Sequence, residues 1–114
     1  MPETPASPRQ RALFSALARC GELILSCGPE GIRANIVGEF RLVRHGGEDR
    51  LDAGDGTQHV HIDWQRVRHA VVGQLDGEGV IDFQDGEETL FRLYRPAGPY
   101  GPEVAPLAGD LLPA

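Results

Sequence analysis

The sequence predicts an α+β fold, in which an N-terminal helix is followed by an antiparallel meander of six to seven strands with one short helical turn. Three observations support this fold class. A helix-capping signal with a helical apolar stripe lies near the N-terminus. After residue 20, short apolar runs alternate with glycine-rich turns, which is typical of sequential antiparallel strands. A length of 114 residues suits one domain with one modest core. We expect that domain to span residues 1–95 and a Pro/Gly-rich tail to span residues 96–114.

Composition narrows the classes of partner. Charged residues make up 25% and hydrophobic residues 40% of the chain, as in ordinary globular proteins. The net charge of -6 argues against binding to nucleic acid or to an anionic membrane surface. The first residues lack the charge and apolar run of a secretory signal, and no apolar stretch is long enough to insert into a membrane. We therefore expect a cytoplasmic protein in which Cys20 and Cys27 are free thiols.

The predicted helix begins at a clear cap. Ser7 suits the N-cap position and Pro8 the first helical position, while residues 1–7 otherwise carry no periodic pattern and are expected to be frayed. The helix should run from about Pro8 to Cys20 and stop at Gly21. Its apolar stripe consists of Leu13, Phe14 and Leu17.

Strands are predicted from Glu22 onward. Residues 22–27 suit either a strand or a continuation of the helix, and the glycine-bounded run favours a strand. Residues 28–31 form a Pro- and Gly-containing turn. Alternating apolar residues predict a second strand over 32–37, which Gly38 interrupts as a bulge before a third apolar run over 40–44.

The middle of the chain holds most of the histidines. Residues 45–57 form a polar, glycine-rich connection, which suggests either a mobile lid or a tolerated insertion. The strand that follows has a period of two. His59, His61 and Asp63 should therefore lie on one face, and Val60, Ile62 and Trp64 on the other. Residues 63–67 read as a helical turn capped by Asp63.

The remaining strands are predicted from the same pattern of apolar runs separated by glycine-rich turns. A strand is expected over residues 68–75, and turns at 76–79 and 84–88 should join it to strands over 80–83 and 89–94. After Arg95, proline and glycine dominate, so the tail is expected to be extended or disordered unless it packs across a partner.

Two histidines on one strand face suggest metal chemistry. Residues His59 and His61 lie about 7 Å apart on an extended strand, so their imidazoles could converge on one metal ion. The alternative is an ordinary polar strand face on which histidine is one of several residues. The candidate third ligands lack a recognised spacing: Cys20, Cys27, His45, Asp63 and His69. No catalytic motif or phosphate-binding glycine loop is present, so no catalytic residue is predicted.

A flat, apolar, dianionic ligand such as haem suits this composition. Haem requires an imidazole for iron, apolar walls for the ring and arginines for two propionates. Candidate walls are Phe40, Trp64, Phe83, Phe91 and Tyr94, and candidate clamps are Arg33, Arg41, Arg44, Arg66, Arg68 and Arg92.

Several segments in fixed order resemble the repeat unit of bacterial cytosolic haem-utilisation proteins. That family includes small haem carriers of the HutX/ChuX kind and double-length, HmuS-like haem-degrading or haem-trafficking proteins. The order is a histidine-x-histidine strand, a short helical turn, a histidine-led strand, a hairpin and an aromatic-rich strand, over residues 21–95. The segments that carry the resemblance are Gly21-Glu22-Leu23-Ile24-Leu25, His59-Val60-His61-Ile62, His69-Ala70-Val71-Val72, Ile81-Asp82-Phe83-Gln84-Asp85-Gly86 and Leu90-Phe91-Arg92-Leu93-Tyr94.

The resemblance implies a haem-utilisation-repeat-like sheet that binds haem on one face. His61 is the best-matched residue to contact haem or its iron, and it is the one metal ligand that we expect. The full set of expected cofactor-binding residues is His61, His69, His59, Arg66, Arg68, Arg92 and Trp64. Family carriers are longer and have helices beyond the last strand, where this chain has its proline-rich tail. Because a single repeat would expose a sheet face, the resemblance also suggests a homodimer.

The leading functional hypothesis is a small cytoplasmic haem-binding or haem-trafficking protein that acts by binding rather than by catalysis. Its partners would be a second copy of itself and a haem donor or acceptor protein. The alternative is a non-enzymatic, dimeric interaction module of the same fold without a haem ligand. A haem-degrading enzyme would need a distal group and an electron donor that the sequence does not supply.

Overall fold

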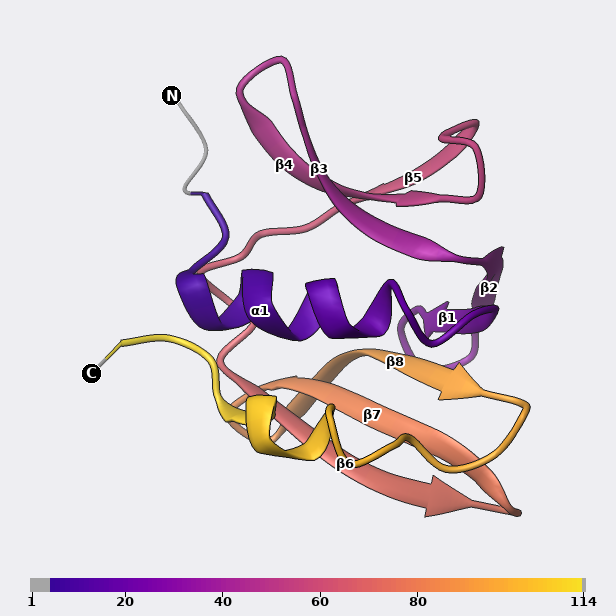
Figure 1. Cartoon of the computed structure of the whole chain (residues 1–114). Coiled ribbons are helices and arrows are strands. Elements are labelled where there is room, and N and C mark those ends of the chain that lie inside the picture. The colour runs from indigo at the N-terminus through magenta and orange to yellow at the C-terminus, as the bar shows by residue number, and fades with distance from the viewer. Residues whose placement is uncertain (1–4, 114) are drawn as a thin grey trace.

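A computed structural model describes residues 5–113, and in this range one α-helix, a short 3₁₀ helix η1 (Ala105–Leu107) and two antiparallel sheets form an α+β fold (Figure 1). The large sheet has the strand order β2-β1-β8-β7-β6-β9, and the small sheet has the order β3-β4-β5. Helix α1 (Pro8–Leu17) lies between the two sheets. The strands of the large sheet are β1 (Leu23–Cys27), β2 (Ala34–Gly38), β6 (His69–Leu75), β7 (Glu78–Asp85), β8 (Glu88–Arg95) and β9 (Gly109–Asp110). Those of the small sheet are β3 (Phe40–His45), β4 (Glu48–Ala53) and β5 (Gln58–His61).

The cap of α1 is the one that the sequence predicts. The Ser7 side chain accepts a hydrogen bond from the Gln10 backbone N–H, and the Gln10 side chain accepts one from the Ser7 N–H, which together form a capping box. The helix ends earlier than expected, at Leu17, and the chain continues to Cys20 in a tight turn. Residues 5–7 are not frayed, because Ala6 is buried and its N–H donates to Asp49; residues 1–4 of the expected frayed leader lie outside the described range.

Aromatic rings join α1 to the large sheet. Phe14 stacks on Phe83 with ring centroids 5.4 Å apart, and Phe83 stacks on Phe91 at 4.5 Å. The Trp64 ring meets the edge of Phe14 at 5.6 Å. These rings are the centre of the core, and full burial of such side chains is worth roughly 1.5–3 kcal/mol each.

The prediction of a long connection over residues 45–57 is wrong, because strand β4 occupies the middle of this segment. Gly46 and Gly47 have φ angles of 59° and 85°, as the tightest hairpin turns require. Strand β4 then pairs with both β3 and β5. Its buried residues Leu51 and Ala53 face the core. Acidic residues on the outer face of this strand gave it the composition of a loop.

Gly38 marks a change of sheet and not a bulge within one strand. It ends β2, and β3 begins in the small sheet two residues later. A Cβ atom at Gly38 would lie 3.3 Å from the backbone nitrogen of Gly54, so the absence of a side chain lets the two segments approach closely. The strand expected to start at Ile32 instead begins at Ala34, opposite Cys27.

The later elements agree with expectation, except for the tail. Residues 63–67 form a turn in which the Asp63 carboxylate accepts a hydrogen bond from the Gln65 N–H. Strands β6, β7 and β8 form the expected antiparallel series, with a register shift between Phe83 and Gln84.

The described part of the tail is neither disordered nor simply extended. Val104 and Leu111 are fully buried, and the two-residue strand β9 pairs with β6. The Leu111 N–H donates to the Arg68 carbonyl at 2.8 Å, and the Ser7 hydroxyl donates to the Leu111 carbonyl at 2.6 Å. The tail through residue 113 therefore packs on its own chain, and Ala114 lies outside the described range. None of the helices in residues 5–113 is long and apolar enough to span a membrane.

Candidate functional site

A cavity of about 230 Å³ lies beside His61, where β5 and the turn after it face β1 and β8 of the large sheet. Its walls are mostly apolar, and His61 and Arg66 are its basic residues. The lining residues are Leu25, Cys27, Val60, His61, Ile62, Asp63, Arg66, Val67, Leu90 and Phe91. We call this cavity the His61 cleft.

Apolar and histidine side chains alternate along β5 and the residue after it, and both kinds line this cleft. Val60 and Ile62 are half-buried and pack against the core, while His59 and His61 are exposed. The expected two-faced strand is therefore present. At the far wall, Leu25 is 1% exposed and Phe91 is 7% exposed, so both are extensions of the core.

His61 is held by a carboxylate. Its Nδ1 atom lies 2.8 Å from Glu48 Oε2, on the neighbouring strand β4, and the His61 side chain remains 57% exposed. A carboxylate at Nδ1 favours the tautomer that carries its proton there and leaves the Nε2 lone pair for a ligand. The pairing of Glu48 with His61 is the arrangement that orients metal-binding histidines in many proteins.

The other two candidate histidines lie outside the lining of this cleft. The His59 ring sits edge-on to the His61 ring, with centroids 5.0 Å apart. His69 begins β6, and its Nδ1 atom lies 2.7 Å from Asp110 on β9. The structure therefore brings His59 and His61 together and places His69 in a separate contact with the tail. Within residues 5–113, no three His, Cys, Asp or Glu side chains cluster closely enough to hold a metal ion.

The three arginines of the expected cofactor-binding set, Arg66, Arg68 and Arg92, are paired with the chain's own carboxylates. Arg66 lies at the His61 cleft and donates to Asp85 at 3.0 Å and to Glu88 at 2.9 Å. The hydrogen bond that Arg66 donates to Asp85, followed by the nearby charge of Glu88, raises the pKa of Arg66. Arg68 lies 3.3 Å from the same Asp85. A ligand carboxylate would therefore have to compete for Arg66, or share it with these partners.

Arg92 belongs to a different part of the surface. It pairs with Asp82 across β8 and β7, and the hydrogen bond that it donates to that carboxylate, followed by the charge of the carboxylate, raises the pKa of Arg92. It does not line the His61 cleft.

Trp64 is a core residue and not a free wall for a ligand. It is 2% exposed, and its indole N–H donates to the Asp49 carbonyl at 2.8 Å. The strand that was expected to carry Trp64 ends at His61, and Trp64 lies in the turn after it, where its ring packs against Phe14 of α1. The apolar walls of the cleft come instead from Leu25, Leu90 and Phe91.

Sequence reasoning missed Glu48, because the strand that carries it was taken for a loop. The signal that could have found it is the Gly46-Gly47 pair directly after the apolar run 40–44, since two glycines in a row are typical of a tight hairpin turn. Leu25 and Leu90 could be found only from the pairing of β1 with β8.

The side chains that line the cleft suit contact with one edge of a haem. The cleft offers one imidazole, apolar side chains and a guanidinium, which are the groups that iron, a porphyrin ring and a propionate require. Its volume of about 230 Å³ is below the roughly 300–1,000 Å³ of sites that enclose a drug-sized ligand. A porphyrin bound there would therefore remain largely exposed.

Comparison with known proteins informs the fold. No protein-family model and no curated protein matches the chain. Among solved structures, a crystal structure of a protein from Erwinia carotovora matches with a TM-score of 0.60 and 17% sequence identity. The match covers 78% of this chain and 59% of that protein, so this chain spans about three-fifths of its length. At this identity the likeness shows a shared fold alone.

Proposed function

We propose that this chain is a small cytoplasmic haem-binding or haem-trafficking protein that acts by binding rather than by catalysis. The observation that carries the proposal is the contact between His61 and Glu48 at the rim of an apolar cleft. In the protein, His61 would present Nε2 to the iron, while Glu48 would hold the ring in the orientation and tautomer that this contact needs. The resemblance of residues 21–95 to the haem-utilisation repeat supports the same ligand.

The shallow cleft fits a carrier better than a haem enzyme. A carrier must hand its ligand to another protein, so one porphyrin edge has to stay accessible to the acceptor. Leu90 and Phe91 would contact the ring on one edge, and Arg66 would meet a propionate by sharing its partners Asp85 and Glu88. Bound haem would supply an iron centre with an open coordination position that the acceptor protein can approach.

A hemin titration tests this proposal. Hemin added to the wild-type protein should give a Soret band that differs from that of free hemin and saturates at one hemin per chain. His61→Ala should abolish or strongly weaken this band. Glu48→Gln should raise the Kd by roughly 10- to 100-fold, as loss of a partner behind a metal-bound histidine typically does.

The matched control is His69→Ala, because His69 has the same kind of carboxylate contact but lies away from the cleft. Its titration should equal that of the wild type. A wild-type titration indistinguishable from free hemin would refute the haem proposal, and an effect of His69→Ala as large as that of His61→Ala would refute the assignment of the ligand.

A second candidate function, the dimeric interaction module, is favoured by the outer face of the large sheet. Val37, Ile24, Tyr94 and Val80 lie directly opposite one another across β2, β1, β8 and β7. Val37 and Val71 are each 51% exposed, and no helix in the described residues covers this face (Figure 1). A second copy stacked face to face would bury this row, as two sheets do in a sandwich.

Sedimentation equilibrium tests this candidate. A wild-type dimer that Val37→Asp converts to a monomer would support it, with Ile32→Asp as the control, because Ile32 is exposed but lies outside the row. A monomeric wild type at tens of micromolar would exclude the dimer at that concentration and leave haem binding untouched.

A further inference from the structure

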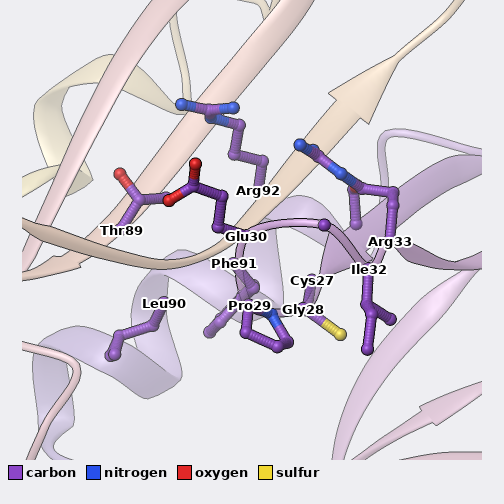
Figure 2. Close-up of a pocket in the computed structure, with 12 residues that line it drawn as sticks. Cys27, Gly28, Pro29, Glu30, Ile32, Arg33, Thr89, Leu90, Phe91 and Arg92 are labelled. Carbon is purple, nitrogen blue, oxygen red and sulfur yellow. The ribbon is translucent and has the colours of Figure 1, made fainter.

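A second, larger cleft lies at the other side of the β1–β8 pair, beneath the loop that joins β1 to β2. It has a volume of about 470 Å³, within the roughly 300–1,000 Å³ of typical small-molecule sites. Figure 2 shows its lining, in which charged and apolar side chains separate to opposite sides of the loop. The lining residues are Ser26, Cys27, Gly28, Pro29, Glu30, Gly31, Ile32, Arg33, Thr89, Leu90, Phe91 and Arg92.

The loop is a tight turn and provides a fixed wall. The Ile32 N–H donates to the Pro29 carbonyl at 3.0 Å, which closes the turn. Gly28 has a φ angle of 134°, and a Cβ atom built there would lie 2.4 Å from the Ile32 carbonyl oxygen. This close approach is compatible only with glycine, so the cleft is shaped by the backbone before any ligand arrives.

Two arginine side chains lie on the polar side of the loop (Figure 2). Arg92 lies directly opposite Ser26 in the β1–β8 pair, and Arg33 Nη1 donates to the Ser26 hydroxyl at 3.2 Å. Ser26 therefore faces Arg92 in the sheet and anchors Arg33 at the same cleft. The contact of Arg33 is with a neutral hydroxyl, so it leaves the positive charge of Arg33 uncompensated. Arg92 donates from Nε to Asp82 and also interacts with the Tyr94 side chain, so a ligand carboxylate would share Arg92 with these two partners.

The apolar side of the cleft carries a hydrophobic side chain that is largely exposed to water. Ile32 is 67% exposed, the highest exposure of any large hydrophobic residue in the described range. It lines the cleft together with Leu90 and Phe91. An alkyl chain laid against these residues would remove apolar surface from water, at roughly 25 cal/mol per Å².

Glu30 limits the charge that the cleft accepts. Its carboxylate lies on the polar side of the loop in Figure 2, toward Thr89. With Asp82 already paired to Arg92, the Glu30 carboxylate is a second negative charge near the two guanidinium groups, so the cleft has no excess of positive charge and disfavours a ligand with two carboxylates.

We propose that this cleft binds an aliphatic monocarboxylate, with its carboxylate at Arg33 and Arg92 and its alkyl chain over Ile32 and Leu90. Planar guanidinium forks match carboxylate geometry, and two of them around one carboxylate give the strongest kind of hydrogen bond that a protein offers this group. The clefts share Cys27, Leu90 and Phe91 in their linings, but their polar groups differ, because His61 and Arg66 lie outside this one and Arg33 and Arg92 lie outside the His61 cleft.

An NMR titration of the ¹⁵N-labelled full chain tests the proposal, with octanoate as the probe and 1-octanol as its uncharged analogue. Octanoate should shift the amides of residues 26–33 and 89–92 in a saturable manner, and octanol should not. Arg33→Gln should raise the octanoate Kd about tenfold, the effect of losing one charge-assisted hydrogen bond. Glu30→Gln should lower it.

The control variants separate this site from the His61 cleft. His61→Ala should leave octanoate binding unchanged, and Arg33→Gln should leave the hemin titration unchanged. Equal binding of octanol and octanoate, an unchanged Kd in Arg33→Gln, or no shift at millimolar octanoate would each overturn the proposal. A higher Kd in Glu30→Gln would overturn the role of Glu30 as the group that limits charge.

Discussion

Gln10 ties helix α1 to the turn that forms one wall of the His61 cleft. Its side chain is fully buried and donates to the Trp64 carbonyl at 2.8 Å and to the Val67 carbonyl at 2.9 Å. Its side-chain oxygen accepts from the Ser7 N–H at 2.7 Å. Replacing Gln10 with methionine keeps the volume and the helix propensity but removes all three hydrogen bonds. The variant therefore isolates the polar contribution of this side chain.

The expected loss of unfolding free energy depends on which hydrogen bonds each partner of Gln10 retains in the variant. The Trp64 carbonyl keeps a bond from the Val67 N–H at 3.3 Å, so its cost is near the lower end of the ~1–3 kcal/mol for an unsatisfied buried group. The Val67 carbonyl loses its side-chain partner in a buried position and should cost about 2 kcal/mol. Because Ser7 is half-buried, water can replace the Gln10 side-chain oxygen as the acceptor for the Ser7 N–H. The free energy of unfolding should therefore fall by about 3 kcal/mol, a large share of the ~5–15 kcal/mol of a typical domain.

Urea denaturation measures this loss directly. Trp64 is the single tryptophan and is buried beside Gln10, so its fluorescence reports on the same region, while far-UV circular dichroism reports on the whole fold. Ser15→Met, on the exposed face of the helix, is the matched control and should stay within about 0.5 kcal/mol of the wild type. A Gln10→Met protein that unfolds within the same 0.5 kcal/mol would refute the view that this amide holds the turn.

Two further predictions concern pH and the loop of the larger cleft. Burial, and after it the charge of the Cys20 thiolate, raise the pKa of Tyr100. The stability that the neutral Tyr100 side chain contributes is therefore present below the ordinary tyrosine pKa of about 10 and is lost as the pH rises above that value. Between pH 9 and 11 the wild type should lose stability more steeply than Tyr100→Phe, and Tyr94→Phe should follow the wild type; parallel slopes for all three in urea titrations would contradict this. Gly28→Ala should destabilise the protein by about 2 kcal/mol or more, because a positive φ and a backbone clash act together, whereas Gly31→Ala meets no atom within 4 Å and should cost only about 1 kcal/mol. Equal melting temperatures for the two glycine variants would show that the turn relaxes freely.

The local elements were predictable because their signals are contained in neighbouring residues. Ser7 and Pro8 specify the start of α1 through capping and a fixed φ, and both act within one helical turn. The period-two pattern around His61 specifies which side chains share a face of β5, because alternate residues of any strand point to opposite sides. The α+β class, the order of most strands and the pairing of His59 with His61 on one face follow from signals of this kind.

Only the tertiary structure decided which of these faces meet. Strand β4 was hidden because its acidic residues resemble a loop, and with it was hidden Glu48, whose contact with His61 depends on the pairing of β4 with β5. The same reason applies to Trp64, which lies in the turn after β5 and is covered by a helix more than forty residues away in the chain. By itself, the sequence determined the helix cap, most strands and the alternation around His61, since these depend on residues a few positions apart. The two clefts depend on contacts between distant segments, and no short pattern encodes those contacts.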